Sequence, residues 1–286
     1  MRKSIDFAKR DAGNVRRRWE AIARERLDIK IAVCVKQIPD PASPQKLDAS
    51  YNLARDGKLI MDESDSYGVE MALQLVDASG SGEVVVFSMA PRSEMSGIRN
   101  ALAMGAHRGV LVSDDALAGS DALSTAKVLA KAIGREPFDL VIAGTESSDG
   151  YTGTLPVQVA ELLGVASVTF AKKVQVDGGS LKVERQTEAG YDEVVSPLPA
   201  VVTVTAGVVE PRYPSFKGIM GAKSKPVETL GIGDLGLTAA EVGKTGAREE
   251  ISEVREAEAR AAGTVVVDEG DAFNKVVEYL EQIKVI

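Results

Sequence analysis

The first half of the chain alternates between short apolar runs and amphipathic segments. The apolar runs are rich in β-branched residues and have the length of buried parallel strands. The segments between them place apolar residues at helical spacing, as Val69, Ala72, Leu73 and Val76 do. The predicted strands cover residues 29–35, 83–88, 109–112 and 139–143, and the predicted helices cover residues 66–76, 91–104, 121–133 and 156–163.

This alternation with short connections predicts right-handed crossovers and a parallel sheet. The predicted fold class is therefore α/β, a three-layer Rossmann-like arrangement with helices on both faces of the sheet. Ligands of such sheets bind beyond the carboxyl ends of the strands, where the strand order reverses. We therefore expect a site built by the loops after Val35, Ser88 and Ala143.

The second half of the chain follows a different pattern. Asp177-Gly178-Gly179 separates two β-rich runs, which is a hairpin signal, and further short strands follow. We interpret this region as a β-hairpin extension of the sheet. The segment after Glu210 is interrupted by Pro and Gly and predicts an exposed loop, and a final helix is predicted over residues 271–283. The predicted strands cover residues 168–176, 181–186, 191–195 and 200–205.

These patterns divide the chain into three parts. Residues 1–28 form an Arg-rich N-terminal extension, disordered or helical, that contains the only tryptophan. Residues 29–232 form the α/β domain, with an exposed loop over residues 210–225. Residues 233–286 form a charged linker and a helix. Because a lone amphipathic helix cannot bury its apolar face by itself, we expect this helix to contact the body of the protein or a partner.

The composition of the chain excludes several classes of function. The 286 residues carry a formal net charge of −8, which argues against nucleic-acid binding over the whole surface. One cysteine excludes an internal disulfide, and one histidine excludes zinc chemistry based on paired imidazoles. No apolar run reaches the roughly 18 residues of a membrane span, the chain lacks the P-loop and GxSxG motifs, and no GxGxxG follows a predicted strand. We predict a soluble protein without a catalytic constellation.

The most informative segment is GTESSDGYTG, residues 144–153, between a predicted strand and a predicted helix. Small residues let the backbone approach a ligand, and the free N–H groups at a helix start attract phosphate. Asp149 is expected to accept from a ribose hydroxyl. We predict phosphate or nucleotide binding, with an ordinary capped loop as the alternative. Residues 61–65 either cap the next helix or line the same mouth. The hydroxyl donors of the loop are Ser147, Ser148, Thr152 and Thr154.

Five segments carry a resemblance to known proteins. They are AVCVKQIPD (32–40), YGVEMALQL (67–75), IRNALAMGAHRG (98–109), GTESSDGYTGTLPVQVAELLG (144–164) and LKVERQTEAG through LPAVVTVTAGVVEPRYPSFKGIMGAKSKP (181–226). In this order they resemble the electron-transfer flavoprotein β-subunit family, from about Ile29 to the C-terminus. The last segment is the most specific, and residues 1–28 lie outside the resemblance.

The resemblance implies an adenine-nucleotide-binding electron carrier subunit and not an enzyme. Such a chain holds a structural AMP and pairs with an α subunit that carries FAD, and the C-terminal helix is expected to contact that subunit. Electrons come from acyl-CoA dehydrogenase-type flavoenzymes of fatty acid oxidation and leave to a quinone oxidoreductase. The implied location is the cytoplasm of a bacterium or the mitochondrial matrix of a eukaryote. Two alternatives stay open: a bifurcating β subunit with its own FAD and an NADH site, and a non-redox ATP- or AMP-binding stress-type protein.

The resemblance also implies site residues. Phe216 occupies the position of the apolar anchor in the family's recognition loop, with Lys217 and Lys223 as basic neighbours, although Gly221 and Ser224 interrupt the usual basic cluster. Neither catalytic residues nor metal ligands are expected. The cofactor-binding positions implied are Cys34, Asp62, Glu63, Ser64, Asp65, Met89, Thr145, Glu146, Ser147, Ser148, Asp149, Gly150, Tyr151, Thr152, Gly153 and Thr154, with Arg185 near the flavin.

Overall fold

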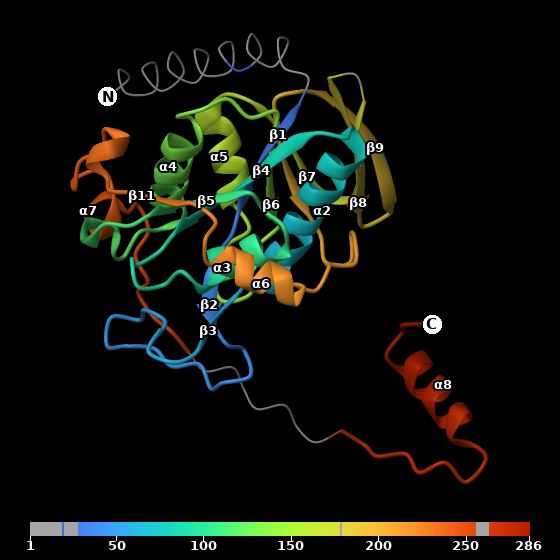
Figure 1. Ribbon diagram of the computed structural model, residues 1–286. Helices are drawn as coiled ribbons and strands as arrows, with labels where there is room; N and C mark the ends of the chain where they lie inside the picture. Colours follow the sequence, from blue (N-terminus) through green and yellow to red (C-terminus); the bar gives the residue numbers. More distant parts are fainter. Residues whose placement is uncertain (1–18, 20–27, 178, 256–262) are drawn as a thin grey trace, which may run out of the picture. The chain divides into compact units, whose positions relative to one another are not determined.

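The computed structural model describes residue 19 and residues 28–177, 179–255 and 263–286 (Figure 1). In this part of the chain, a nine-stranded sheet has the order β11-β5-β4-β1-β6-β10-β7-β8-β9. Every neighbouring pair from β11 to β7 is parallel. The pairs β7–β8 and β8–β9 are antiparallel. This arrangement confirms the predicted α/β class and its hairpin extension.

The central parallel strands are short and mostly buried, which explains their continuous apolar sequences, whereas the edge strand β11 is only partly buried. In the sheet, β4 lies on one side of β1 and β6 lies on the other. The strands after β4 extend the sheet on the first side and the strands after β6 extend it on the second, so the strand order reverses at β1. Their carboxyl ends therefore flank the expected ligand crevice. The bounds are β1 Ile29–Cys34, β4 Gly82–Met89, β5 Arg108–Val112, β6 Leu140–Gly144, β10 Ala200–Val204 and β11 Val227–Leu230.

Helices cover both faces of this sheet and create two hydrophobic cores. On β1, Ile31 and Val33 face one core, whereas Ala32 and Cys34 face the other, as the two-residue repeat of a strand requires. Helices α2 and α3 contribute to the first core, and α4 and α5 contribute to the second (Figure 1). The helices are α2 Glu63–Ser79, α3 Ser96–Met104, α4 Ala122–Ile133 and α5 Leu155–Leu163, with a short 3-10 turn η1 at Asp115–Leu117.

The hairpin extension is built from β7 Ala166–Asp177, β8 Ser180–Thr187 and β9 Gly190–Pro197. The chain then returns into the sheet, because β10 lies between β6 and β7 and is parallel to both. All five residues of β10 are buried. The sequence predicts the strands of this region but not the parallel insertion of β10, which depends on contacts with β6, more than 50 residues earlier in the chain.

Three elements differ from the sequence-based expectation. The loop predicted over residues 210–225 contains helix α6, Phe216–Ala222. Residues Val227–Leu230 add β11 to the edge of the sheet beside β5. A two-stranded antiparallel sheet, β2 Gln37–Pro39 with β3 Leu59–Met61, follows β1 where the sequence analysis expects a loop. These elements are short, so local sequence preference is weak and pairing with distant residues decides their structure.

The compact part that contains the sheet extends to Glu250, and Ile251–Ile286 forms a second part. The sequence-based boundary is at residue 232, but the 3-10 turn η2 at Gly233–Leu235 and the short helix α7 at Gly243–Gly246 still belong to the first part. Val242 is fully buried there. In the second part, α8 Ala272–Gln282 buries none of its residues. No helix among the described residues is long and apolar enough to cross a membrane.

Trp19, the one described residue before Asp28, is 1% exposed and belongs to the core on the α4 and α5 side. Its ring packs edge-on against Phe138, with 5.9 Å between the ring centroids. Phe138 in turn packs edge-on against Phe87 of β4, at 5.6 Å. Edge-to-face geometry is a favourable arrangement for aromatic rings. Trp19, a residue of the predicted N-terminal extension, therefore contributes to the core of the domain through a buried and well-packed ring.

Candidate functional site

The carboxyl ends of β1 and β6 meet the first turn of α2. The Asp62 N–H donates to the Lys36 carbonyl oxygen at 2.9 Å, and the Lys36 N–H donates to Asp65 Oδ2 at 2.5 Å. Gly144, at the end of β6, also donates its N–H to Asp65. A Cβ added to Gly144 would lie 3.0 Å from the Cβ of Ser64, so glycine suits the close approach of β6 to α2. The loops after Val35 and Ala143 therefore lie together, as predicted from the strand order.

Asp62 joins α2 to the loop after β6. One carboxylate oxygen, Oδ1, accepts from the Ser64 N–H at 3.0 Å and from Ser64 Oγ at 2.7 Å. The other, Oδ2, accepts from the Ser148 N–H at 2.7 Å and from Ser148 Oγ at 3.1 Å. Asp62 is fully buried. Because both oxygens are engaged within the protein, Asp62 caps the helix and positions the loop at the same time.

Asp65 and Cys34 lie in the buried floor of this site. Burial raises the pKa of the Asp65 carboxyl to about 8, although the hydrogen bond from the Lys36 N–H opposes the shift, and the nearby Asp62 carboxylate adds to it. Burial also raises the pKa of the Cys34 thiol to about 12, with Asp65 as a second cause. A thiol with this pKa stays protonated near neutral pH, so Cys34 packs as a small apolar residue and is not a nucleophile.

The raised pKa of Asp65 makes the stability of the domain depend on pH. The unfolded chain releases the Asp65 proton near pH 4, whereas the folded domain retains it up to about pH 8. Folding stability should therefore fall as the pH rises from about 4 to about 8. We expect Asp65→Asn to remove this pH dependence. The free energy of unfolding of the variant, relative to that of the wild type, should therefore rise from about pH 4 to about pH 8 and stay constant above that. Urea unfolding of both proteins at several pH values measures the difference, and a difference that does not change with pH would contradict the prediction.

A cluster of charges surrounds Asp149 of the loop. Lys36 Nζ lies 2.5 Å from Asp149 Oδ1 and 3.2 Å from Ser147 Oγ. Arg55 Nη1 lies 3.6 Å from Asp149 Oδ2, and Arg55 also donates to the Gln37 carbonyl oxygen. The sequence analysis missed both cations, because nothing in their local pattern indicates that they meet residue 149. The contact between Asp149 and a ribose hydroxyl stays a prediction. In such a contact the Asp149 carboxylate would accept from the ribose and from Lys36 at the same time.

The rest of the loop lies open to solvent and leads into α5. Residues 150–154 are exposed, and Gly153 has a φ of +66°, a conformation that favours glycine. Thr154 is the N-cap of α5 but makes no capping hydrogen bond through its side chain, which leaves the N–H groups of Leu155 and Val157 uncapped by it, while Pro156 between them has no N–H. Such groups attract anions, and the partly exposed ammonium of Lys36 adds positive charge. The residues at this site therefore fit an anionic group such as a phosphate.

The structure brings most of the predicted cofactor-binding residues to this crevice. The segment 62–65 and the loop 145–154 are in contact through Asp62, and Cys34 lies beneath them. Met89 ends β4, the neighbour of β1 on the other side. Arg185 is on β8 of the hairpin, opposite Ala171 of β7, and its guanidinium lies 3.6 Å from Asp192 Oδ2. The role of each residue in holding a cofactor stays a prediction.

A separate apolar surface lies on and beside α6. Phe216, Ile219 and Met220 are exposed and share one face of this helix, because residues three and four apart are neighbours. Tyr213, just before the helix, is 92% exposed. We call these four residues the α6 patch. The sequence analysis identified only Phe216, although the i, i+3, i+4 spacing of the other two helical residues was a signal for them. Lys217 and Lys223, which are close to these residues in the sequence, are exposed. Lys225 instead donates to the carbonyl oxygens of Leu102 and Ala106.

Arg212 anchors the segment that leads to the α6 patch. It donates to Glu70 of α2 through Nε at 2.7 Å, Nη2 at 3.1 Å and its backbone N–H at 3.2 Å. Glu70 is 3% exposed. Burial alone raises the pKa of Glu70, but the hydrogen bonds from Arg212 and Gln74 outweigh it and hold the pKa below its usual value. The segment is thus held by a buried carboxylate that stays ionised.

We expect Arg212→Ala to lower the free energy of unfolding at pH 7 by about 2 kcal/mol, because it leaves the Glu70 carboxylate without its charged partner. Arg212→Lys keeps the charge but not the paired geometry and should have a smaller effect. A group with a lowered pKa contributes stability that is lost as the pH falls. The difference between wild type and Arg212→Ala, measured by urea unfolding, should therefore shrink between pH 6 and about pH 4. An equal difference at both pH values would show that Glu70 is not the cause.

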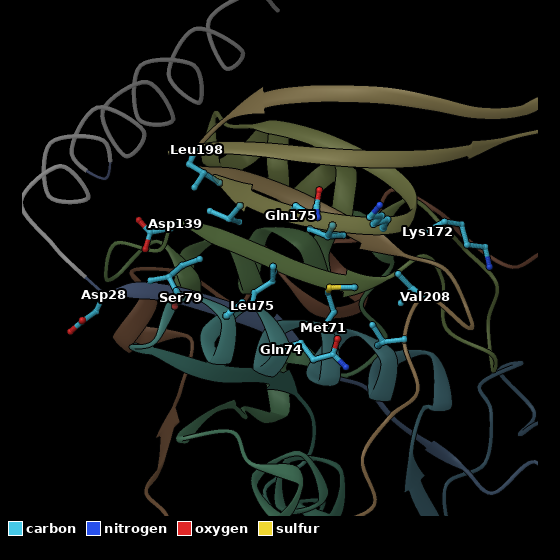
Figure 2. Close-up of a pocket in the computed structure, with 16 residues that line it drawn as sticks. Asp28, Met71, Gln74, Leu75, Ser79, Asp139, Lys172, Gln175, Leu198 and Val208 are labelled. Atoms are coloured by element: carbon cyan, nitrogen blue, oxygen red, sulfur yellow. The ribbon is translucent and has the colours of Figure 1, made fainter. Parts of the chain in front are cut away.

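Away from this crevice, a hollow of about 670 Å³ lies between α2 and β7 (Figure 2). Met71, Gln74 and Leu75 of α2 face Gln175 of β7 across it. Its wall mixes aliphatic residues with polar and charged ones such as Lys172 and Lys173, and none of the predicted cofactor-binding residues is among the described residues that line it. Size alone favours this groove as a ligand site. The open helix start, the cation and the hydroxyl groups favour the crevice at the carboxyl ends of the strands, and we give these chemical features more weight.

Comparison with known proteins finds relatives over most of the chain. The model of the electron transfer flavoprotein domain family matches residues 51–235. The electron transfer flavoprotein subunit beta of Mycobacterium tuberculosis H37Rv is 40% identical over 263 residues, which cover 90% of this chain and 99% of the relative. The protein of the same name from Mycobacterium leprae is also 40% identical over 263 residues, with the same coverage. The one from Megasphaera elsdenii is 31% identical over 258 residues, 87% of this chain and 96% of the relative.

Proposed function

Because the chain belongs to the electron-transfer flavoprotein β-subunit family, with an electron-transfer role, we propose that it is the AMP-holding subunit of a heterodimeric carrier. Its partner is an α subunit, as the name of the relatives implies. A bound FAD, carried mainly by the α subunit, supplies the redox chemistry. The chain itself binds the nucleotide, orients the loop after β6 and offers a docking surface. It has no catalytic role of its own.

The observation that carries this proposal is the loop of residues 145–154, fixed at one end by Asp62 and open at the start of α5. Backbone N–H groups there suit a phosphate, and hydroxyl groups and small residues suit the close approach of a nucleotide. Lys36 adds a cation that is already positioned by Asp149 at 2.5 Å. AMP satisfies this set of groups through its single phosphate, and a second FAD satisfies it through its pyrophosphate.

The α6 patch supports the second half of the proposal. Large aromatic side chains near the centre of an interface are typical of binding hot spots. Phe216 is 81% exposed and is the expected anchor. We propose that acyl-CoA dehydrogenase-type flavoenzymes dock on this patch and that a quinone oxidoreductase accepts the electrons. Lys217 and Lys223 then contribute to docking through their charge.

The test is the nucleotide content of the complex. The chain is co-expressed with its α subunit, the purified complex is denatured, and the released nucleotides are identified by chromatography. We expect one AMP and one FAD per heterodimer. Two FAD and no AMP would contradict the simple carrier and favour a bifurcating subunit, whereas failure to form a complex would overturn the proposal.

A further inference from the structure

A hollow of about 260 Å³ opens beyond the carboxyl ends of β6 and β10. Whole small-molecule ligands usually occupy about 300–1,000 Å³, so this space suits one ring system and not a complete dinucleotide. Two exposed aromatic residues, Tyr151 and Phe170, belong to its wall. Neither the sequence analysis nor the family resemblance gives Phe170 a role. The other lining residues relevant here are Ser64, Thr145, Ser148 and Val204.

Phe170 has an unusual backbone conformation for its residue type. Val202 pairs with Val168 and Val204 pairs with Ala171, so one residue of β10 faces two residues of β7. This is a β-bulge, and Phe170 within it has a φ of +58°. Glycine usually occupies left-handed positions of bulges, and a bulky residue there is an outlier. Such strain persists where the surroundings determine the conformation, and it is concentrated at binding sites.

The bulge is hydrogen-bonded to the start of the nucleotide loop. The Phe170 N–H donates to Thr203 Oγ1 at 2.9 Å, and this hydroxyl lies 3.4 Å from Thr145 Oγ1. Thr145 in turn donates its N–H and its hydroxyl to the Val204 carbonyl oxygen, at 3.2 Å and 3.1 Å. These contacts fix the backbone of Phe170 while its side chain remains 45% exposed. The ring is thus presented to the hollow and not folded into the core.

Tyr151 shares both properties, a positive φ and an exposed side chain. Its φ is +48°, and its side chain is 67% exposed. Its N–H donates to the Ser147 carbonyl oxygen at 2.9 Å, which holds the turn of the loop. Two exposed aromatic rings, each on a strained but hydrogen-bonded backbone, therefore line one small hollow.

We propose that Phe170 and Tyr151 form a subsite for a flat heteroaromatic ring of a nucleotide. The ring packs against the aromatic faces, and the hydroxyl oxygens of Thr145 and Ser148, whose protons are donated to Val204 and Asp62, can accept from N–H groups at its polar edge. This inference rests on the proposed function, because it requires a nucleotide at the loop after β6. The ring has two possible sources, the base of the nucleotide that this chain holds and the isoalloxazine of the FAD carried by the α subunit.

The test uses the complex with the α subunit. After removal of the endogenous nucleotide, AMP binding is measured by equilibrium dialysis, and FAD is followed by its visible absorption spectrum. Phe170→Leu keeps an apolar side chain but removes the flat ring, and Phe170→Tyr keeps the ring. We expect Phe170→Leu to weaken AMP binding about tenfold, as loss of base stacking does, and Phe170→Tyr to change it less than about twofold. Tyr191→Leu, which removes an exposed ring on β9, is the control and should change nothing.

The outcomes separate the two sources. Weaker AMP binding with an unchanged FAD spectrum places the base of AMP at the subsite. Unchanged AMP binding with a shifted spectrum or loss of FAD places the flavin ring there. If Phe170→Leu changes neither, or if Tyr191→Leu has the same effect, the subsite proposal is overturned. A wild-type complex that binds no nucleotide would overturn the proposed function instead. Phe170→Gly removes the ring together with the backbone strain, so it provides the same test if Phe170→Leu fails to fold.

Discussion

Asp62→Ala is expected to lower the free energy of unfolding by about 3 kcal/mol and to weaken the binding of nucleotide to the complex. The substitution removes a buried carboxylate that accepts from two backbone N–H groups and two hydroxyls. Hydrogen bonds to a charged acceptor contribute about 1.5–3 kcal/mol, and donors left unpaired in a buried place add to the loss. The loop after β6 also loses its contact with α2, so it no longer holds its binding conformation.

The matched control is Asp121→Ala. Asp121 caps α4 in a similar way, because its carboxylate accepts from the Ser124 N–H at 2.7 Å and from the Arg248 N–H at 2.6 Å. Its removal should cost about 1 kcal/mol and leave nucleotide binding unchanged. Urea unfolding and AMP dialysis on both variants distinguish the cases. If Asp62→Ala destabilises the domain but binds AMP as the wild type does, then Asp62 supports the helix and not the loop.

Phe138→Ala is expected to have the largest effect on stability, a loss of about 4 kcal/mol. The Phe138 ring is fully buried between Trp19 and Phe87, and Lys30 Nζ lies 5.2 Å from its centroid. Truncation leaves a cavity bordered by rings from distant parts of the chain, and rigid rings do not collapse into such a space easily. Equilibrium unfolding in urea measures the loss.

Phe138→Leu keeps part of the buried volume and should lose less than half as much. Tyr191→Ala removes an aromatic side chain that is 64% exposed on β9 and should change stability by no more than about 0.5 kcal/mol. A loss for Phe138→Ala no larger than that of Tyr191→Ala would show that the three rings do not form a packed cluster.

The parallel strands were predictable because their burial leaves a direct mark on the sequence. Five of the six residues of β1 are buried aliphatic or small residues, and all five of β6 are buried, so the apolar runs are continuous. Their order in the sheet gave the position of the crevice. Helix α6 could not be predicted in this way. Gly218 and Gly221 are unfavourable within a helix, yet Gly218 allows the close packing of α6 on the Ala103 carbonyl oxygen of α3.

The candidate site was predictable only in part for a similar reason. The loop of residues 144–153 is marked by its small and hydroxyl-bearing residues, and that part of the hypothesis needed no tertiary information. The contacts of Lys36 and Arg55 with Asp149 join residues about 95–115 positions apart in the chain, and no local pattern encodes them. Phe170 reads as an ordinary strand residue, because the bulge that turns it outward exists only when β7 pairs with β10.

The burial of Trp19 has a practical consequence for any study of this chain. It is the single tryptophan among 286 residues, so the intrinsic fluorescence excited at the tryptophan band comes from one place in the protein. A tryptophan shielded from water emits at shorter wavelength than an exposed one. The emission spectrum therefore reports whether the Trp19 ring is packed against Phe138. A red shift that precedes the loss of helical circular dichroism during denaturation would show that this contact opens before the sheet unfolds.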